Sequence, residues 1–332
     1  MAYSSGSTII ALDYNTFAQG GAAVNHAVAN INTTWGVGSG DRGYGQSTTL
    51  PPVTTGTDTV TATQWSTMIA RLNSMLTHQA GSGSGITAPT TGATIAYLTT
   101  LSSSITTAFN NRLNVASNGT DVAGSATNTV WNSAAPTTLQ IIKTATFANA
   151  DQARYFFNAG GKIILTFGAV TNTLGNSKGA DWVSLISTKM ASITVGGYTN
   201  VRNGTGGTVG SSNTAKGYWN AGTTNVSIIN LTSASGTADY GANAISVGIK
   251  TNGVQGANGD VGTVFTFQID LSDGAADTNN PPTGIPVYVP AGTAPAQGNF
   301  NDALNLTIPV SITIRPPENT NLPTAISNPT IA

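Results

Sequence analysis

The chain has 332 residues, of which only 8% are charged, against about 25% in most globular proteins. Its 12 Lys and Arg nearly balance its 13 Asp and Glu, and a net charge of −1 offers nucleic acid no electrostatic attraction. The sequence has no Cys, which excludes disulfides and thiolate chemistry, and no apolar run of about 18 residues, which excludes a transmembrane helix.

Helices are predicted in the first third of the chain. A short one is expected over 24–31. A longer one starts at a Thr61 or Thr63 cap and runs to the glycine-rich stretch at Gly81. Its apolar face, with a period of about 3.6 residues, consists of Trp65, Met68, Ile69, Leu72, Met75 and Leu76. A further helix is predicted over 94–113, and a Gly/Ser/Thr/Pro-rich loop would join it to the first as an αα-hairpin.

From about residue 117, β-branched and aromatic runs alternate with Gly, Asn and Ser turns, which indicates an all-β region. Strands are predicted over 137–146, 162–166, 192–195, 225–232, 244–251, 264–271 and 304–315. Pro309 predicts that the last strand is an edge strand or carries a bulge. A helix is expected over 181–190 with Trp182 inward, and 168–179 and 200–217 are predicted to be loops.

These elements predict a mainly β protein, a C-terminal antiparallel β-sandwich with an N-terminal helical part. The expected regions are a helical attachment region over 1–116, the sandwich over 117–316, and an extended C-terminal arm over 317–332. The arm is rich in Pro and Asn, and we expect it to lie on a neighbouring subunit. We expect no secretory signal, because the first residues lack its basic and apolar regions.

Residues for catalysis or metal binding are scarce. A conventional zinc site is not expected from two His, one Glu and no Cys. His78 lies near the last turn of its predicted helix, where a histidine complements the helix dipole. Glycoside hydrolysis needs a pair of carboxylates with separated pKa values. Asp270 and Asp273 are close in sequence, but they lie at a predicted strand end beside Gly274 and are interpreted as turn residues. A calcium site at Asp260 is a less favoured alternative. We therefore expect no cofactor, no metal and no catalytic residue.

Two groups of aromatic residues are candidates for recognition. Tyr155-Phe156-Phe157 cannot all face one side of a strand, so they either plug a corner of the core, which is the favoured interpretation, or anchor a neighbouring subunit. Aromatic rings in Gly/Asn-rich segments are candidates for stacking on a sugar, with hydroxyls and amides nearby to hydrogen-bond it. These candidate glycan contacts are Tyr198, Tyr218, Trp219 and Tyr240.

The stretch Ala-Arg-Tyr-Phe-Phe-Asn-Ala-Gly-Gly over 153–161 carries a resemblance to a known family, as do four shorter motifs. These motifs are Asp13-Tyr14-Asn15, Tyr44-Gly45-Gln46, Thr63-Gln64-Trp65 and His78-Gln79. Together they resemble virion structural proteins of tailed phages, notably those of cyanobacteria and other aquatic hosts. The resemblance ends near Gly161, where the sequence continues as Lys162-Ile163-Ile164-Leu165 in place of the more acidic and polar strand start expected there. It implies a structural protein without catalytic residues.

The expected function is therefore a non-enzymatic subunit of a tailed-phage virion, in the tail, baseplate or fibre, assembled in the host cytoplasm without membrane insertion. Its partners would be other copies of itself and neighbouring virion proteins. The candidate interface residues are Trp65, Met68, Leu72, Met75, Tyr155, Phe156 and Phe157. The alternatives are a capsid decoration protein and a host-recognition module that binds a surface glycan.

Overall fold

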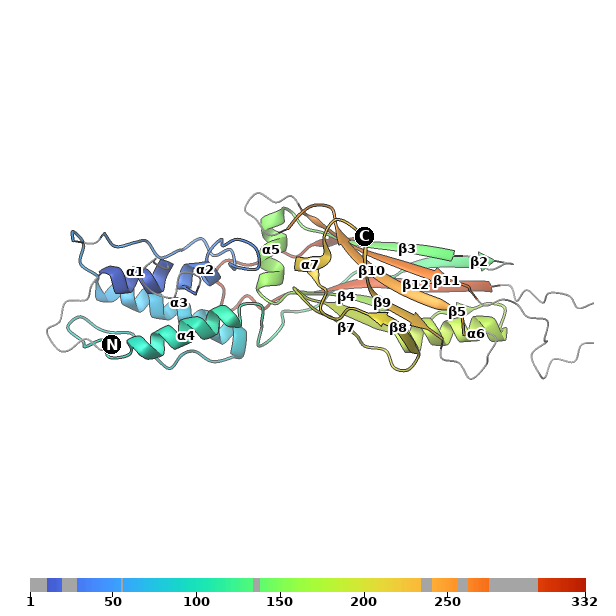
Figure 1. Cartoon of the computed structure of the whole chain (residues 1–332), viewed down its shortest axis with the longest axis horizontal. Coiled ribbons are helices and arrows are strands. Elements are labelled where there is room, and N and C mark those ends of the chain that lie inside the picture. The colour runs from blue at the N-terminus through green and yellow to red at the C-terminus, as the bar shows by residue number, and fades with distance from the viewer. Residues whose placement is uncertain are drawn as a thin grey trace, which may run out of the picture.

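The computed structural model describes residues 11–19, 29–54, 56–133, 138–233, 241–255, 262–274 and 304–332. The molecule is elongated, with the helical part at one end and the β-sandwich at the other (Figure 1). The candidate glycan contact Tyr240, the calcium alternative at Asp260 and most of the helix expected over 24–31 lie outside the described residues. The predicted fold class is confirmed, because two antiparallel sheets follow an N-terminal helical part.

The helical part is built around one long amphipathic helix. Its elements are α1 (Ala11–Gln19), α2 (Ile31–Trp35), α3 (Ala62–Ala80) and α4 (Leu98–Asn110). A reciprocal capping box between Thr61 and Gln64 starts α3, and Gly81 ends it in the left-handed conformation with φ of 81°. The predicted apolar face of α3 is buried, and Tyr14 and Phe17 of α1 pack edge-on against Trp65.

The predicted αα-hairpin is wrong, because α3 and α4 run in the same direction. Gln79, at the end of α3, donates to the Ala108 carbonyl near the end of α4 at 2.8 Å. The connection 81–97 returns along the helices, and Ser66 near the start of α3 donates to Pro89 in that connection. Both helices therefore end at the same place, beside the sandwich (Figure 1).

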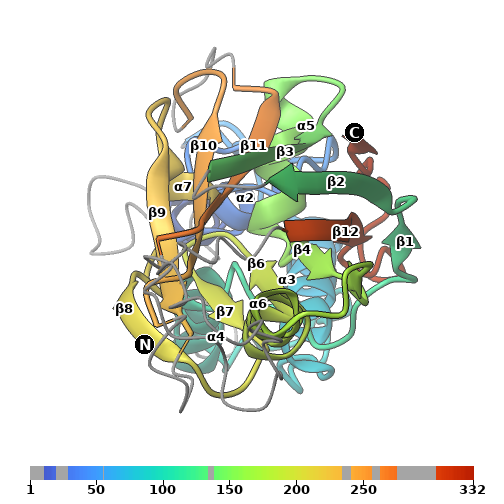
Figure 2. The same ribbon diagram turned by 90° about the vertical axis from the view of Figure 1, so that its right-hand side faces the viewer.

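The sandwich consists of two antiparallel sheets with the core between them (Figure 2). The seven-stranded sheet contains β1 (Val122–Ala123), β2 (Thr127–Ser133), β4 (Lys162–Phe167), β5 (Thr171–Asn172), β6 (Ser192–Val195), β7 (Asn200–Arg202) and β12 (Leu304–Arg315). The six-stranded sheet has the order β13 (Thr330–Ile331), β3 (Thr138–Thr146), β11 (Val264–Ser272), β10 (Ala244–Thr251), β9 (Val226–Thr232) and β8 (Thr208–Ser212). Strict alternation of buried residues along β12 shows that one face of its sheet covers the core.

The strand that contains Pro309 is central, so its predicted edge position is wrong. β12 pairs with β1 and β2 on one side and with β4 and β5 on the other. The Pro309 carbonyl accepts from Gly168, which lies in the gap between β4 and β5. In an antiparallel ladder a residue's N–H and C=O point the same way, so the missing N–H of proline falls in that gap and no ladder bond is lost.

The three consecutive aromatics lie on helix α5 (Ala150–Asn158), which Asn149 caps through the backbone N–H of Gln152. The helix lies between the helical part and the sandwich (Figure 1). The Tyr155 ring meets the loop at Gly45, whereas Phe156 and Phe157 pack on Phe147 of the sandwich. All three side chains are buried because this helix is enclosed on several sides.

The predicted helix over 181–190 is present, but in two parts. It comprises α6 (Ser177–Val183) and the π-helix η1 (Ser184–Met190), which contact strands of both sheets. Trp182, predicted to face inward, is buried. The two predicted loops also contain short strands, β5 in the first and β7 and β8 in the second. The short helix α7 (Tyr218–Ala221) follows β8.

The C-terminal residues lie on their own chain, which corrects the expectation of an arm on a neighbour. Leu322 and Ile326 are buried, and β13 pairs with β3 at an edge of the six-stranded sheet. Gln46 of the helical part exchanges two hydrogen bonds with the Thr324 backbone, at 3.0 and 2.8 Å. The segment therefore ties the helical part to the sandwich.

Candidate functional site

The loop 36–46 follows α2 and forms the helical side of the junction with the sandwich. Two of its glycines are required there. A Cβ on Gly43 would lie 2.5 Å from the Gly36 carbonyl oxygen, and a Cβ on Gly45 would lie 2.3 Å from the Tyr155 ring. Both have positive φ, of 85° and 74°. The Tyr44-Gly45-Gln46 motif is therefore where the backbone of the loop packs directly against α5.

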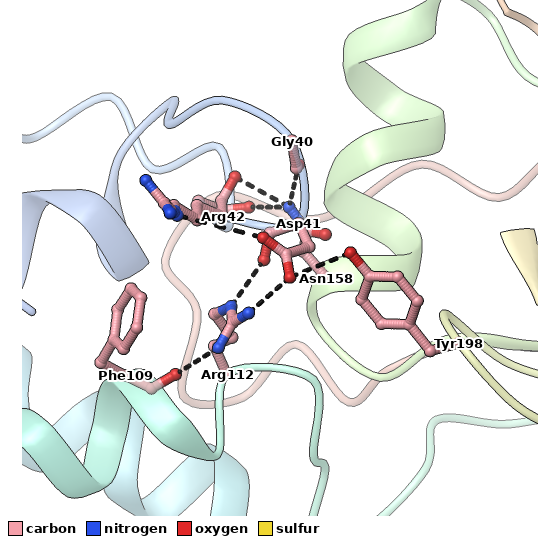
Figure 3. A network of polar contacts seen from close by, with 8 residues as sticks. Gly40, Asp41, Arg42, Phe109, Arg112, Asn158 and Tyr198 are labelled. Carbon is pink, nitrogen blue, oxygen red and sulfur yellow. Dashed lines mark hydrogen bonds and ion pairs between the residues drawn. The ribbon is translucent and has the colours of Figure 1, made fainter. Parts of the chain in front are cut away.

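One buried amide makes several of the contacts that hold this loop against α5. Asn158, the last residue of α5, donates through Nδ2 to the carbonyls of Gly40, Arg42 and Gly43, at 3.2, 2.8 and 3.1 Å (Figure 3). Three carbonyl oxygens converge on one NH2 group, so the loop has one well-defined path around Asn158.

Asp41, at the tip of the loop, connects three elements. Arg112, just after α4, forms an ion pair with its carboxylate and donates to its backbone carbonyl (Figure 3). Tyr198, which follows β6, donates to the same carboxylate at 3.1 Å. The Arg112 guanidinium also lies 4.7 Å from the centre of the Phe109 ring, a cation–π contact. Burial and the Asp41 carboxylate raise the pKa of Tyr198 to about 12, so its hydroxyl stays protonated and can donate.

Tyr44 and His78 fill the interior of the junction. The Tyr44 hydroxyl donates to the Arg112 carbonyl at 2.7 Å and accepts from Gln79 at 2.7 Å, and burial raises its pKa well above the ordinary value. His78 Nε2 donates to the Ala159 carbonyl at 2.9 Å, and its Nδ1 lies 3.4 Å from Glu318 of the C-terminal segment. Burial lowers the pKa of His78, more than the Ala159 carbonyl and the Glu318 carboxylate raise it.

A cavity of about 490 Å³ opens beside this junction. The residues around it come from α3, from the segment after α4, from the turn after α5, from the start of β4 and from the turn between β6 and β7. They are Gln79, Leu113, Asn114, Val115, Gly160, Gly161, Lys162, Gly196, Gly197, Tyr198 and Thr199. One aromatic ring, an ammonium, two amides and two hydroxyls thus line a space in the size range of small-molecule sites.

The structure separates the predicted glycan contacts. Tyr198 lines the cavity and is 38% exposed, with its ring held in place by the bond to Asp41. Tyr218 is buried and stacks on Phe157, with ring centres 4.1 Å apart. Trp219 packs partly buried against the core and against Gly197. Of the described candidates, only Tyr198 presents a ring to the cavity.

The candidate interface residues all lie in the interior of this single chain. The buried set is Trp65, Met68, Leu72, Met75, Tyr155, Phe156 and Phe157. They form the core of the helical part and the plug at the junction, so contact with another subunit must use other residues.

Sequence reasoning did not single out Asp41, Arg112 or Glu318, and it included Asn158 only as part of the 153–161 motif. Charged residues are rare in this chain, so each one was a signal of a specific pairing, but the pairings span dozens of residues and could not be read locally. Asp273 was interpreted as a turn residue and is in fact buried in an ion pair with Lys178. Asp270 accepts hydrogen bonds from Gln140 and Gln268.

Within the described residues, no group of three or more His, Asp or Glu is placed to hold a metal ion. The helices among those residues include none with the length and apolar character needed to cross a membrane. Comparison with protein-family models, with curated proteins and with solved structures finds no match.

Proposed function

We propose that the chain is a non-enzymatic structural subunit of a tailed-phage virion, in the tail, baseplate or fibre. The observation that carries this proposal is the closed junction between the helical part and the sandwich. Asn158, the Asp41–Arg112 pair and the returning C-terminal segment join the two ends of an elongated body (Figures 1 and 3). These contacts hold the two parts as one body, which suits a subunit that occupies a fixed place in a particle.

The scarcity of charge also favours this proposal. A surface made polar by hydroxyls and amides packs against copies of itself without strong charge repulsion. The sequence resemblance to virion structural proteins points the same way. Capsid decoration remains the alternative location, because it needs the same kind of neutral, β-rich subunit.

Light scattering of the purified protein over a concentration series tests self-assembly. We expect a discrete closed oligomer whose mass is constant over a wide range of concentration, because virion parts are symmetric. A monomer at every concentration would contradict assembly through contacts between copies of this chain.

A second function, glycan recognition, is favoured by the Tyr198 cavity alone. A fixed aromatic ring beside Lys162 and Asn114 provides a stacking surface and hydrogen-bonding groups for a sugar.

Glycan-array binding of three proteins tests glycan recognition: the wild type, Tyr198→Ala and Tyr198→Phe. Loss of a bound glycan in Y198A with retention in Y198F supports stacking on the ring. Absence of any binding, or equal binding by Y198A, contradicts it.

A further inference from the structure

A buried ion pair lies at the end of the sandwich far from the helical part. Lys178 Nζ of α6 and Asp273 Oδ2, just after β11, are 2.8 Å apart, and each side chain is only 1% exposed. Both charges are thus removed from water in a chain that has few charges. Burial removes the hydration of both ions, and their mutual attraction offsets that loss only in part, so the stability of the fold does not by itself account for the pair.

The ion pair is enclosed by buried side chains, one of which hydrogen-bonds to Asp273. Trp182, one turn after Lys178 on α6, is buried and packs edge-on against Trp131 of β2, with ring centres 4.8 Å apart. With its amide nitrogen toward Asp273, buried Asn243 donates to Asp273 Oδ1 at 2.9 Å and accepts from Trp182 Nε1 at 3.2 Å. The Asp273 carboxyl group therefore meets an amine at one oxygen and a hydrogen-bond donor at the other.

We propose that Lys178 and Asp273 become joined by an amide bond between Nζ and Cγ, an intramolecular isopeptide cross-link. One proton passes from the ammonium to Asp273 Oδ2, which leaves a neutral amine beside a neutral acid. These are the forms that a low-dielectric enclosure penalises least. The Nζ lone pair attacks Cγ, a second proton moves from Nζ to Oδ2, and the Cγ–Oδ2 bond breaks. The ammonium supplies both protons of the departing water and keeps its third hydrogen on the amide nitrogen, so no other reactant is needed.

The fold provides two conditions that an amine and an acid lack in water: close contact, and a donor that stabilises the tetrahedral intermediate. Two groups held in contact react as if at very high concentration, and the effective molarity of well-oriented pairs reaches about 10⁵ M or more. Asn243 donates to Oδ1, the oxygen on which negative charge grows as Nζ attacks, and so stabilises the tetrahedral intermediate.

The cross-link would join the two layers of the sandwich. α6 packs on β12 and β5 of the seven-stranded sheet, whereas Asp273 follows β11 of the six-stranded sheet. The bond would close a loop from 178 to 273 and restrict the unfolded chain as a long-range disulfide does. The chain has no Cys with which to form that disulfide.

Intact mass spectrometry of the denatured full-length protein tests the proposal directly. We expect the main species to be lighter than an uncondensed chain by the mass of one water. A protease digest should then yield a branched peptide that joins the segments around Lys178 and Asp273. A main species at the full uncondensed mass would overturn the proposal.

Lys178→Arg is the matched variant, because arginine keeps the buried charge but does not condense with a carboxylate. We expect K178R to have its full uncondensed mass. Lys189→Arg, a change in a nearby lysine, should keep the loss of one water.

The Asp273-Gly274 sequence offers another route to the same mass, since aspartyl–glycyl bonds can close to a succinimide. Water loss that persists in K178R would identify the succinimide and overturn the cross-link. Asn243→Ala should lower the fraction of cross-linked protein, and an unchanged fraction would overturn the role given to Asn243.

Discussion

Asn158 shows how much of the junction depends on one side chain. Asn158→Ala removes the only amide that the carbonyls of Gly40, Arg42 and Gly43 share, in a place that water does not reach. We expect a loss of about 2–4 kcal/mol in the free energy of unfolding, measured by denaturant titration. Asn114→Ala, at an exposed position, serves as the control and should cost less than about 0.5 kcal/mol. A similarly small effect of N158A would show that the loop holds itself.

His78 predicts a pH dependence with a definite sign. Burial lowers its pKa in the folded protein, so the unfolded chain binds a proton first as the pH falls. Stability is therefore constant above the ordinary histidine value of about 6.5 and declines below it, down to the lowered pKa. Unfolding of the wild type and His78→Gln should be compared between about pH 7.5 and 5. The decline should be smaller in H78Q, and equal slopes would contradict the assignment.

Glu318 acts in a separate, more acidic range. Its burial would by itself raise its pKa, but hydrogen bonds from Asn321 and Thr320, together with the nearby His78, lower it. A carboxyl with a lowered pKa contributes stability above its ordinary value of about 4.3 and loses it as the pH falls through the folded value. We expect Glu318→Gln to weaken the acid dependence below about pH 4.3. Because the carboxylate then no longer raises the pKa of His78, the decline in the histidine range should become larger in E318Q. The same unfolding series, continued to lower pH, measures both.

Removal of the C-terminal segment should lower the stability of the chain substantially. Deleting residues 316–332 removes the buried side chains Leu322 and Ile326, the contacts to Gln46 and the strand β13. Each buried aliphatic side chain contributes about 1.5–3 kcal/mol, so we expect a clear fall in the melting temperature. Deleting only 329–332 removes β13 alone and should cost much less. If the longer deletion melts like the wild type, the segment does not tie the two parts together.

The elements that could be predicted are those whose ends and apolar positions are specified by residues within the same short stretch of sequence. Helix α3 has its own caps and apolar period, and β6, β10 and β12 begin and end at their predicted residues. β2, β7 and β8 were missed because each has only one or two apolar residues among polar residues and glycine, which gives no clear alternation. The place of α5 depends on a loop more than a hundred residues away, and the position of Pro309 depends on a gap between two other strands. Neither dependence is visible in a local stretch of sequence.

The molecule as a whole should behave as one stiff body in solution. Arg112 ties α4 to Asp41, and through that carboxylate to Tyr198 of the sandwich. We expect Arg112→Ala to broaden the distribution of interatomic distances in small-angle X-ray scattering and to leave the circular dichroism unchanged. Arg42→Ala removes a longer and more exposed contact to the same carboxylate, at 4.0 Å, and should leave the scattering curve as it is. An unchanged curve for R112A would mean that other contacts suffice.

The position of β12 determines when this protein can fold. It is the last long strand of the chain, yet it is the shared partner of β1, β2, β4 and β5. During translation those four strands are made more than a hundred residues before β12, and their apolar faces stay without their shared partner until it follows. Closure of the seven-stranded sheet therefore waits for the synthesis of β12, and a chain that terminates before β12 lacks the strand that joins the others.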